Sequence, residues 1–421
     1  MDKLTFPENF MWGAAASSYQ TEGHNTNCDW YVEEINDKKL LLENRRLTDI
    51  CGQACDHWNR YKEDYDIAEK IGINIYRTSA EWSRVFPDEN QEDPAAIAHY
   101  RQMFTDLKKR GIKLMLCLHH FTLPLWISRK GGFENKSYII ENFRVYAKRV
   151  VEALGDLVDY WLPVNEPNIV AMMCYLVGKF PPYKIDKQKF RKVLQTVLEI
   201  QLIAYDIIKN SFPNAPVGAA LAFQHYQPYR PGSRKDIYYA NLEFNKMNRW
   251  FLEGLESGRL QTRKRRNKNK IHKGIDFIGV NYYTSSYLKS GKPAPFKDGE
   301  VFTDMGWLVY PQGLYDVLEY AHNNFNVPVI ITENGAATID EDFRIWFISE
   351  HLKAVHKAVE KGFDIQGFMY WSLTDNYEWE RGYTKKFGLA KVDFDTQERI
   401  LKRGGEWYAG VIKQNGFIPK S

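Results

Sequence analysis

Short apolar runs alternate with longer amphipathic stretches along the chain. Most of the short runs are rich in β-branched or aromatic residues and end in polar side chains, which is typical of buried parallel strands. The longer stretches repeat their apolar positions at a spacing of about 3.6 residues, which is typical of helices. The pattern predicts eight strands, at Phe10–Ser17, Ile73–Trp82, Lys113–His120, Tyr160–Glu166, Pro216–Phe223, Asp276–Tyr283, Pro328–Glu333 and Ile365–Leu373.

The alternation of strands and helices indicates the fold class. Helices are expected at Pro94–Arg110, Ser137–Leu154, Gln188–Asn210, Asp236–Glu256, Gln312–Asn323, Asp342–Lys361 and Arg403–Asn415. Strands alternating with helices form a parallel sheet with right-handed crossovers, and eight repeats favour an α/β fold of the (β/α)8 TIM-barrel type. No G-x-G-x-x-G motif follows the first strand, which disfavours an open dinucleotide-binding sheet. No linker-like composition interrupts the chain, so residues 1–421 are expected to form a single domain.

Two segments do not follow the alternation. Thr26–Ala54 is expected to be a long irregular connection after the first strand. Arg259–Lys273 is strongly basic and contains no acidic residue. We interpret it as a solvated surface loop, and the alternative is a contact of Arg263–Lys273 with a membrane surface or a polyanion. Its charges are not interleaved with aromatic residues, which disfavours single-stranded nucleic acid as a partner.

Composition narrows the class of protein. The 421 residues are 44% hydrophobic and 26% charged, as in soluble globular proteins. The net charge of +4 is too balanced to indicate nucleic acid or a membrane as the partner of the whole chain. Five cysteines without a dense framework, no apparent signal peptide and no apolar run of about 18 residues predict a reduced, cytoplasmic protein.

Polar and aromatic side chains gather near the ends of the predicted strands, where the active site of such a barrel lies. They are Gln20, Glu22, Arg77, His119, His120, Asn165, Glu166, Gln224, His225, Asn281, Tyr282, Tyr283, Glu333, Asn334, Trp371, Asp375, Glu378 and Trp379. The set is rich in carboxylates, amides and indoles. It has no serine or cysteine nucleophile at a strand end and no glycine-rich phosphate loop.

Two glutamates, Glu166 and Glu333, follow non-adjacent strands and can face each other across the barrel mouth. Glycoside hydrolysis needs one carboxylic acid to protonate the leaving oxygen and a second carboxylate that attacks carbon or activates water. Arg77 and Tyr283 could keep one of the two carboxylates ionised. The alternative is that each glutamate pairs with an arginine for structural reasons alone. The gap between the carboxylates, which separates attack on carbon from activation of water, stays open at this stage.

Several longer strings support the carboxylate interpretation. FMWGAAASSYQTEG, ACDHWNRYKED, YRTSAEWSR, WLPVNEP, DFIGVNYYT, ITENG and YWSLTDNYEWERGY occur in this order. Together they resemble glycoside hydrolase family 1, the retaining β-glucosidases and β-glycosidases of the (β/α)8 fold. The resemblance runs from Phe6 to about Phe417. VNEP and TENG are short, but the ordered set is specific.

The resemblance implies a role for each matching residue. Glu166 would be the general acid/base, Glu333 the nucleophile, and Asn165 the amide at the sugar 2-hydroxyl. Arg77 and Tyr283 would hold the nucleophile, with Asn281 beside them. Gln20, His120, Glu378 and Trp379 would bind the 3-, 4- and 6-hydroxyls, with Trp371 under the sugar ring, Phe387 near its 6-position and Trp307 at the aglycone entrance. We read His119, Asp56, His57, Trp82 and Arg84 as structural, and we expect no metal and no other cofactor.

Departures from the family pattern bear on the substrate. His120-Phe121-Thr122 replaces the usual His-Trp-Asp, and Pro163 replaces a common threonine. The serine and lysine arrangement of 6-phospho-β-glycosidases is lacking, and an anionic Glu378 would repel a 6-phosphate, so unphosphorylated sugars are expected. Arg259–Lys273 and Ser285–Thr303 look short, which suggests an open aglycone site.

These observations predict a retaining exo-β-glycosidase that removes terminal non-reducing β-D-glucosyl residues, and β-D-galactosyl or β-D-fucosyl residues as well. Its partners would be small β-glycosides and short oligosaccharides, with no nucleic acid. The alternatives are a β-mannosidase, β-galactosidase or transglycosylase of the same family, a non-catalytic glycan-binding protein, or a membrane-surface protein. The preferred sugar epimer, the natural aglycone and a homo-oligomeric state stay open.

Overall fold

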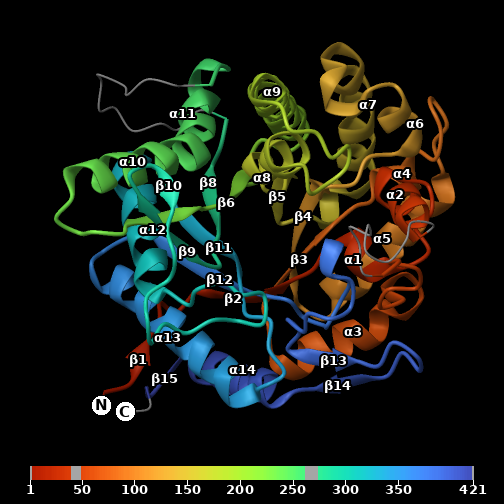
Figure 1. Ribbon diagram of the computed structural model, residues 1–421. Coiled ribbons are helices and arrows are strands. Elements are labelled where there is room, and N and C mark those ends of the chain that lie inside the picture. Colours follow the sequence, from red (N-terminus) through yellow and green to blue (C-terminus); the bar gives the residue numbers. More distant parts are fainter. Residues whose placement is uncertain (1, 39–48, 261–273, 420–421) are drawn as a thin grey trace.

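Eight parallel strands form the centre of the computed structural model, which describes residues 2–38, 49–260 and 274–419 (Figure 1). The strands are β2 (Met11–Ala15), β3 (Ile75–Ser79), β4 (Lys113–His119), β5 (Tyr160–Val164), β6 (Gly218–Ala222), β8 (Phe277–Asn281), β11 (Val329–Asn334) and β12 (Ile365–Trp371). They pair in the order β5-β4-β3-β2-β12-β11-β8-β6. Isolated parallel bridges, Trp161–Val217 and Asn165–Ala220, join the edge strands β5 and β6 and bring the sheet round to a nearly closed barrel. The (β/α)8 prediction is confirmed.

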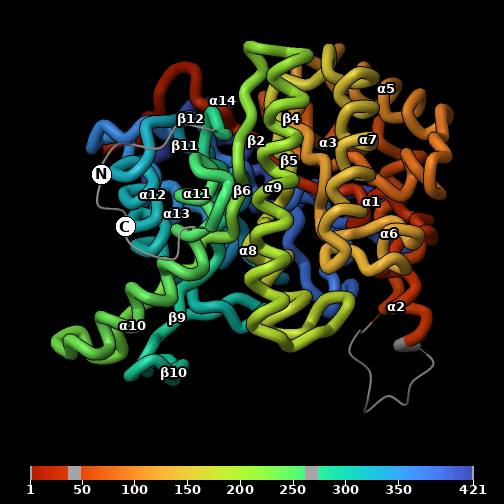
Figure 2. The backbone as a smooth tube through the Cα atoms, turned by 90° about the horizontal axis from the view of Figure 1, so that it is seen from above, coloured from red at the N-terminus to blue at the C-terminus, as the bar shows by residue number. Residues whose placement is uncertain are grey.

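Helices surround the barrel (Figures 1 and 2). The longer ones are α3 (His57–Ile71), α5 (Pro94–Lys109), α7 (Lys136–Leu154), α9 (Lys187–Ser211), α10 (Arg234–Phe244), α11 (Trp250–Ser257), α12 (Pro311–Asn324), α13 (Glu341–Glu360) and α14 (Arg403–Gln414). Asp93, Asp186 and Asp340 accept backbone N–H groups at the starts of α5, α9 and α13, which satisfies donors that have no partner inside the helix. No helix among the described residues is long and apolar enough to cross a membrane.

Shorter elements lie in the connections. They are β1 (Leu4–Thr5), β7 (His225–Pro228), β9 (Ser285–Lys289), β10 (Lys292–Pro293), β13 (Ala390–Val392), β14 (Arg399–Leu401), β15 (Gly416–Phe417), α1 (Ser18–Glu22), α2 (Asp29–Lys38), α4 (Trp82–Val85), α6 (Leu125–Arg129) and α8 (Pro167–Met172). Single turns lie at η2 (Gly132–Glu134), η3 (Gly155–Leu157), η4 (Met173–Val177), η5 (Asn245–Arg249) and η6 (Trp379–Arg381). β1 pairs with β15, which places the two ends of the chain side by side (Figure 1).

The structure differs from the sequence prediction at several places, of which four bear on the barrel and its connections. Thr26–Ala54, expected to be irregular, contains α2. α3 was not predicted, although its inward side chains recur at helical spacing. The predicted helix Asp236–Glu256 is divided by the π-helical turn η5. A small sheet of β7, β9 and β10 was also missed, and Figure 2 shows β9 and β10 projecting beside α10. Nearly all of the basic segment lies at residues 261–273, outside the described residues, and so does its proposed membrane contact.

Apolar side chains fill the barrel below the strand ends. Those that point inward are Met11, Ile75, Met115, Cys117, Leu162, Ala220, Phe277, Ile330 and Met369, and all are buried. A larger apolar cluster lies between the strands and the helices. Because apolar side chains occupy the lower barrel, the inward-facing polar residues are confined to the C-terminal ends of the strands.

Candidate active site

A cavity of about 290 Å³ lies at the C-terminal ends of the barrel strands. Eleven of the thirteen predicted site residues line it: Gln20, His120, Asn165, Glu166, Tyr283, Trp307, Glu333, Trp371, Glu378, Trp379 and Phe387. The other two, Arg77 and Asn281, are fully buried and hydrogen bond to the lining carboxylates. The structure therefore brings together side chains from both halves of the chain.

Glu333, at the end of β11, is held at both carboxylate oxygens. Arg77 of β3 forms an ion pair with its Oε1, and the hydroxyl of Tyr283 donates to its Oε2 at 2.5 Å. The side chains of Arg77 and Glu333 are only 1% and 5% exposed. A buried guanidinium and a hydroxyl donor both stabilise an ionised carboxylate. Glu333 is thus arranged as a fixed anion.

Glu166 follows β5 and has a different environment. Its backbone φ is +45°, a left-handed conformation that non-glycine residues rarely adopt. Asn281 Nδ2 donates to its Oε1 at 2.8 Å. Burial, and next the charge of Glu333, raise the pKa of Glu166 to about 8, although Asn281 and Arg77 act in the opposite direction. Glu166 therefore holds a proton at neutral pH, as a general acid must.

Asn165 connects the two carboxylate environments. Its Oδ1 accepts from Arg77 Nη2 and, at 3.2 Å, from Asn281 Nδ2. Its Nδ2 lies 3.2 Å from Nε2 of His120. Burial and the charge of Arg77 keep the pKa of His120 well below its ordinary value, so this imidazole is neutral and can accept the amide hydrogen. The Asn165 amide orientation follows from this set of partners.

Gln20 and Glu378 meet at another part of the cavity wall. Gln20 Nε2 donates to the Tyr377 carbonyl at 2.7 Å and lies 3.4 Å from Glu378 Oε2. Burial, followed by the charge of Glu380, raises the pKa of Glu378 to about 8. The sequence predicts that Glu378 is an anion and repels a 6-phosphate. With a pKa of about 8 this carboxyl is mostly protonated at neutral pH, so the expected electrostatic repulsion has no basis.

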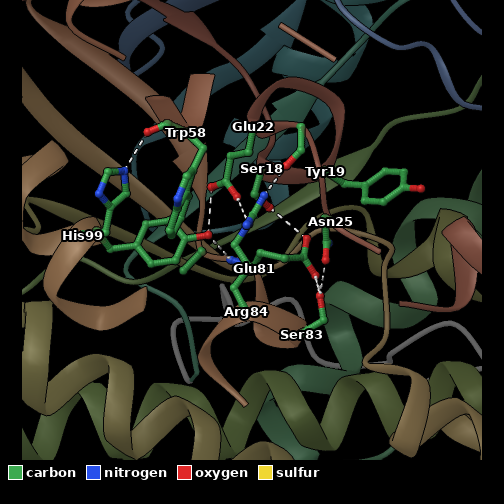
Figure 3. Close-up of polar contacts among 12 residues, drawn as sticks. Ser18, Tyr19, Glu22, Asn25, Trp58, Glu81, Ser83, Arg84 and His99 are labelled. Atoms are coloured by element: carbon green, nitrogen blue, oxygen red, sulfur yellow. Dashed lines mark hydrogen bonds and ion pairs between the residues drawn. The ribbon is translucent and has the colours of Figure 1, made fainter. Parts of the chain in front are cut away.

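A buried ion-pair network anchors helix α1, which carries Gln20. Glu22, at the end of α1, accepts from Arg84 Nε at 2.7 Å and from the Tyr100 hydroxyl at 2.8 Å. Figure 3 shows Arg84 close to Glu22 and Trp58, and the ring centre of Trp58 lies 4.3 Å from the guanidinium carbon. Glu22 is therefore a structural residue beside the site.

Aromatic rings form much of the cavity wall. The ring of His120 is nearly parallel to those of Trp371 and Trp379, with centroid distances of 6.1 and 6.3 Å. Trp307 lies 5.3 Å from the Tyr283 ring on another side. Polar groups set between aromatic faces suit a sugar, which has hydroxyls at its edges and C–H groups on its faces.

The sequence prediction missed part of the lining. The missed residues are Phe121, Ile169, Met172, Met173, Lys179, Phe180, Ala222, Thr284, Met305, Glu380 and Arg381. Most lie in loops or helices after the strands, where the periodic pattern carries no signal. Conversely, His225 is in β7, where its Nε2 lies 3.2 Å from Asp316, and it does not line the cavity. Among the described residues no cluster of three metal-ligating side chains occurs.

Comparison with known proteins places this site in a family. The sequence model described as Glycosyl hydrolase family 1 matches residues 2–417. The chain is 34% identical to Beta-glucosidase A of Acetivibrio thermocellus over 99% of this chain and 100% of the relative. It is 30% identical to a beta-galactosidase of Saccharolobus solfataricus over 98% of this chain and 96% of the relative. A solved beta-glycosidase from Pyrococcus horikoshii superposes with a TM-score of 0.89 at 36% identity, covering 99% and 97% of the two chains.

A (β/α)8 barrel with a sugar-sized cavity and two differently held glutamates at its mouth defines a glycoside hydrolase. The chain belongs to glycosyl hydrolase family 1 and is a β-glycosidase. The family resemblance inferred from the ordered motifs is confirmed.

Proposed function

We propose that the protein is a retaining exo-β-glycosidase that acts on terminal β-D-glucosyl residues and also accepts β-D-galactosides and β-D-fucosides. The observation that carries the proposal is the contrast between the two glutamates. Arg77 and Tyr283 hold Glu333 as an anion, whereas burial raises the pKa of Glu166 to about 8. A nucleophile and a general acid need this difference.

The reaction would proceed by two displacements. Glu333 attacks the anomeric carbon while Glu166 gives its proton to the glycosidic oxygen, so the C–O bond breaks and the aglycone leaves as an alcohol. The sugar is then an ester of Glu333. Glu166, now a carboxylate, takes a proton from water, which attacks the same carbon and releases Glu333. Two inversions leave the β configuration unchanged.

The remaining lining residues support binding of one neutral sugar ring. Asn165 would contact the 2-hydroxyl, and Gln20, His120, Glu378 and Trp379 the other hydroxyls. Trp371 would lie under the ring, Phe387 near its 6-position and Trp307 at the aglycone side. A cavity of about 290 Å³ accommodates one sugar and part of an aglycone, which supports exo cleavage.

We also propose that residues 1–421 form one catalytic domain, which the family match over residues 2–417 supports. The five cysteines are free and buried, which supports a reducing compartment such as the cytoplasm. β-Galactosidase is the second candidate activity, because a relative with that name matches nearly the whole chain. The ranking of kcat/KM for β-glucoside, β-galactoside, β-fucoside and β-mannoside separates these activities.

Proton NMR of the protein mixed with p-nitrophenyl β-glucoside tests the mechanism. We expect β-glucose to appear before its mutarotation product. If α-glucose appears first, Glu333 is not a nucleophile and the double displacement is wrong. If the galactoside is turned over and the glucoside is not, the mechanism stands and the proposed sugar preference is wrong.

A further inference from the structure

Thr332, the residue before Glu333, is completely buried beside the site. β11 pairs regularly with β8 at Ile331–Val280, but the next pair is Glu333–Asn281, so Thr332 is an extra residue in this ladder. Ile330 points into the barrel, and strict alternation would turn Thr332 inward and Glu333 outward. The bulge allows both side chains to face the barrel interior, because an extra residue re-aims the side chains that follow it.

The hydroxyl of Thr332 reaches the amide of Asn281. Oγ1 donates to Asn281 Oδ1 at 2.6 Å. The nearby Gly279 leaves space for this contact, because a Cβ at that position would lie 2.9 Å from Thr332 Oγ1. Thr332 itself does not line the cavity, so its hydroxyl acts on Asn281 and not on a substrate.

The other end of the Asn281 amide faces two acceptors. Nδ2 donates to Glu166 Oε1 at 2.8 Å and to Asn165 Oδ1 at 3.2 Å. The Asn281 amide therefore has a hydrogen-bond donor, the Thr332 hydroxyl, beside its oxygen, and two acceptors, Glu166 Oε1 and Asn165 Oδ1, beside its NH₂ group. Rotating the amide by half a turn would place its oxygen against Glu166 and Asn165, and its NH₂ group against the threonine.

We propose that Thr332 is a positioning residue that fixes the Asn281 amide so that its NH₂ group occupies Glu166 Oε1 and the acid proton of Glu166 is carried on Oε2. This inference deepens the proposed function and rests on it, because it assumes that Glu166 is the general acid. Without the threonine hydroxyl, the amide can turn its oxygen toward Glu166. That oxygen accepts a proton held on Oε1 and draws it away from the glycosidic oxygen.

The expected change in pH dependence has a definite sign. Asn281 lowers the pKa of Glu166 by donating to its carboxylate, and either loss or reversal of that bond favours the protonated form. The other charged or titratable groups around Glu166 are Glu333, Arg77, Tyr283, Glu378 and the neutral His120. A Thr332 substitution leaves all of them in place. The alkaline limb of kcat/KM should therefore move to higher pH.

The experiment compares Thr332→Val, which has nearly the same shape without the hydroxyl, with Thr332→Ser, which restores it. A control is Thr196→Val in α9, where the hydroxyl donates to the Lys192 carbonyl of its own helix. For each protein, kcat/KM is measured against pH on a phenyl β-glycoside and a 2,4-dinitrophenyl β-glycoside of the sugar preferred by the wild type. The phenyl leaving group needs a proton and the dinitrophenyl group does not. Thermal unfolding checks that each variant is folded.

We expect Thr332→Val to lose about tenfold or more in kcat/KM on the phenyl substrate and less than about twofold on the dinitrophenyl substrate. Its alkaline limb should lie at higher pH, and Thr332→Ser should resemble the wild type. Equal losses on both substrates, an unmoved alkaline limb, or a serine variant as poor as the valine variant would overturn the inference.

The proposed function is checked separately in the same experiment. The ratio of kcat/KM on the phenyl substrate to kcat/KM on the dinitrophenyl substrate should be far lower for Glu166→Ala than for the wild type. If wild type and Glu166→Ala have the same ratio, Glu166 is not the acid and the proposed function fails. If their ratios differ but Thr332→Val matches the wild type, only the role of Thr332 is wrong.

Discussion

At the scale of single residues, the two glutamates are both buried and yet differ in what surrounds them. Glu333 meets a guanidinium and a phenol, whereas Glu166 meets one neutral amide donor. Burial penalises a carboxylate, and a buried cation or hydrogen-bond donors offset that penalty. The hydrogen-bond and ion-pair partners, and not the depth of burial, therefore distinguish the two carboxyl groups.

Removing each carboxyl should affect catalysis differently. Glu333→Ala removes the carboxylate that we propose as the nucleophile, so we expect no measurable turnover on any glycoside. Glu166→Ala should lose about 10²–10⁴-fold in kcat/KM on glycosides with basic leaving groups and much less on activated aryl glycosides. Steady-state kinetics on a series of aryl glycosides measures both effects. Equal losses across the series for Glu166→Ala would contradict its assignment as the acid.

The wild-type pH profile should reflect the pKa of Glu166. Because the proposed acid, Glu166, is active in its protonated form, kcat/KM should fall as the pH rises past about 8. Glu166→Gln should lack this limb on an activated substrate, whose departure needs no proton. A pH titration of kcat/KM for both proteins tests this, and an alkaline limb that survives in Glu166→Gln would assign the limb to another group.

At the scale of elements, loops after the strands are tied down by side chains from the surrounding helices. Arg344 of α13 is fully buried and donates to the carbonyls of Ala336, Thr338, Lys386 and Phe387. It thereby joins the loop after β11 to the loop that carries Phe387 at the cavity wall. No local pattern in the sequence indicates this arrangement, because the partners come from distant segments.

Arg344→Met should be strongly destabilising. It keeps the apolar stem but leaves several buried carbonyls without a donor, so we expect a loss of about 3–5 kcal/mol in the free energy of unfolding. Arg101→Met is a suitable control, because Arg101 forms an exposed ion pair with Asp156 and should cost less than about 1 kcal/mol. Urea unfolding of the two variants measures the difference. Similar losses in both would show that the Arg344 contacts are dispensable.

At the scale of the whole molecule, several carboxyl groups are buried in surroundings that favour their protonated form. Burial is the main cause that raises the pKa values of Asp29 and Glu34 to about 7 and those of Glu166 and Glu378 to about 8. At a pH below the pKa that these carboxyl groups have in the unfolded chain, they are protonated in both the folded and the unfolded protein. As the pH rises toward 7 or 8, the unfolded state loses these protons first, so folding stability falls.

The free energy of unfolding should therefore decrease between about pH 5 and pH 8. Asp29→Asn is nearly isosteric and retains the oxygen that accepts from the Trp30 and Leu123 backbone. The Asp29→Asn substitution should make the fall of the free energy of unfolding with pH shallower, by on the order of 1 kcal/mol per pH unit up to about pH 7. Asp186→Asn is a control, because backbone N–H groups lower the pKa of Asp186 and it titrates at more acidic pH. Denaturant unfolding at several pH values measures the slopes, and an unchanged slope in Asp29→Asn would contradict the prediction.

Much of the fold was predictable because the strands and most of the long helices have regular periodic patterns. The π-helical turn η5 and the small β7–β9–β10 sheet were missed, since neither changes the local pattern in a recognisable way. In the site, the polar residues at strand ends were predictable from the barrel rule together with the family motifs. Met172, Met173 and Phe180 were not, because their place on the cavity wall depends on how η4 and the loop after it pack.

The barrel fold, the family and the position of two glutamates at strand ends could all be predicted from the sequence, because periodicity and ordered motifs are local properties of the chain. The tertiary structure shows which groups contact each glutamate, since Arg77 reaches Glu333 from β3, and Tyr283 and Asn281 reach the two glutamates from the end of β8. It also decided that Glu378 is protonated at neutral pH and that Thr332 contacts Asn281 through a bulge. Charge states and amide orientations depend on neighbours in space, and those neighbours exist only once the barrel has formed.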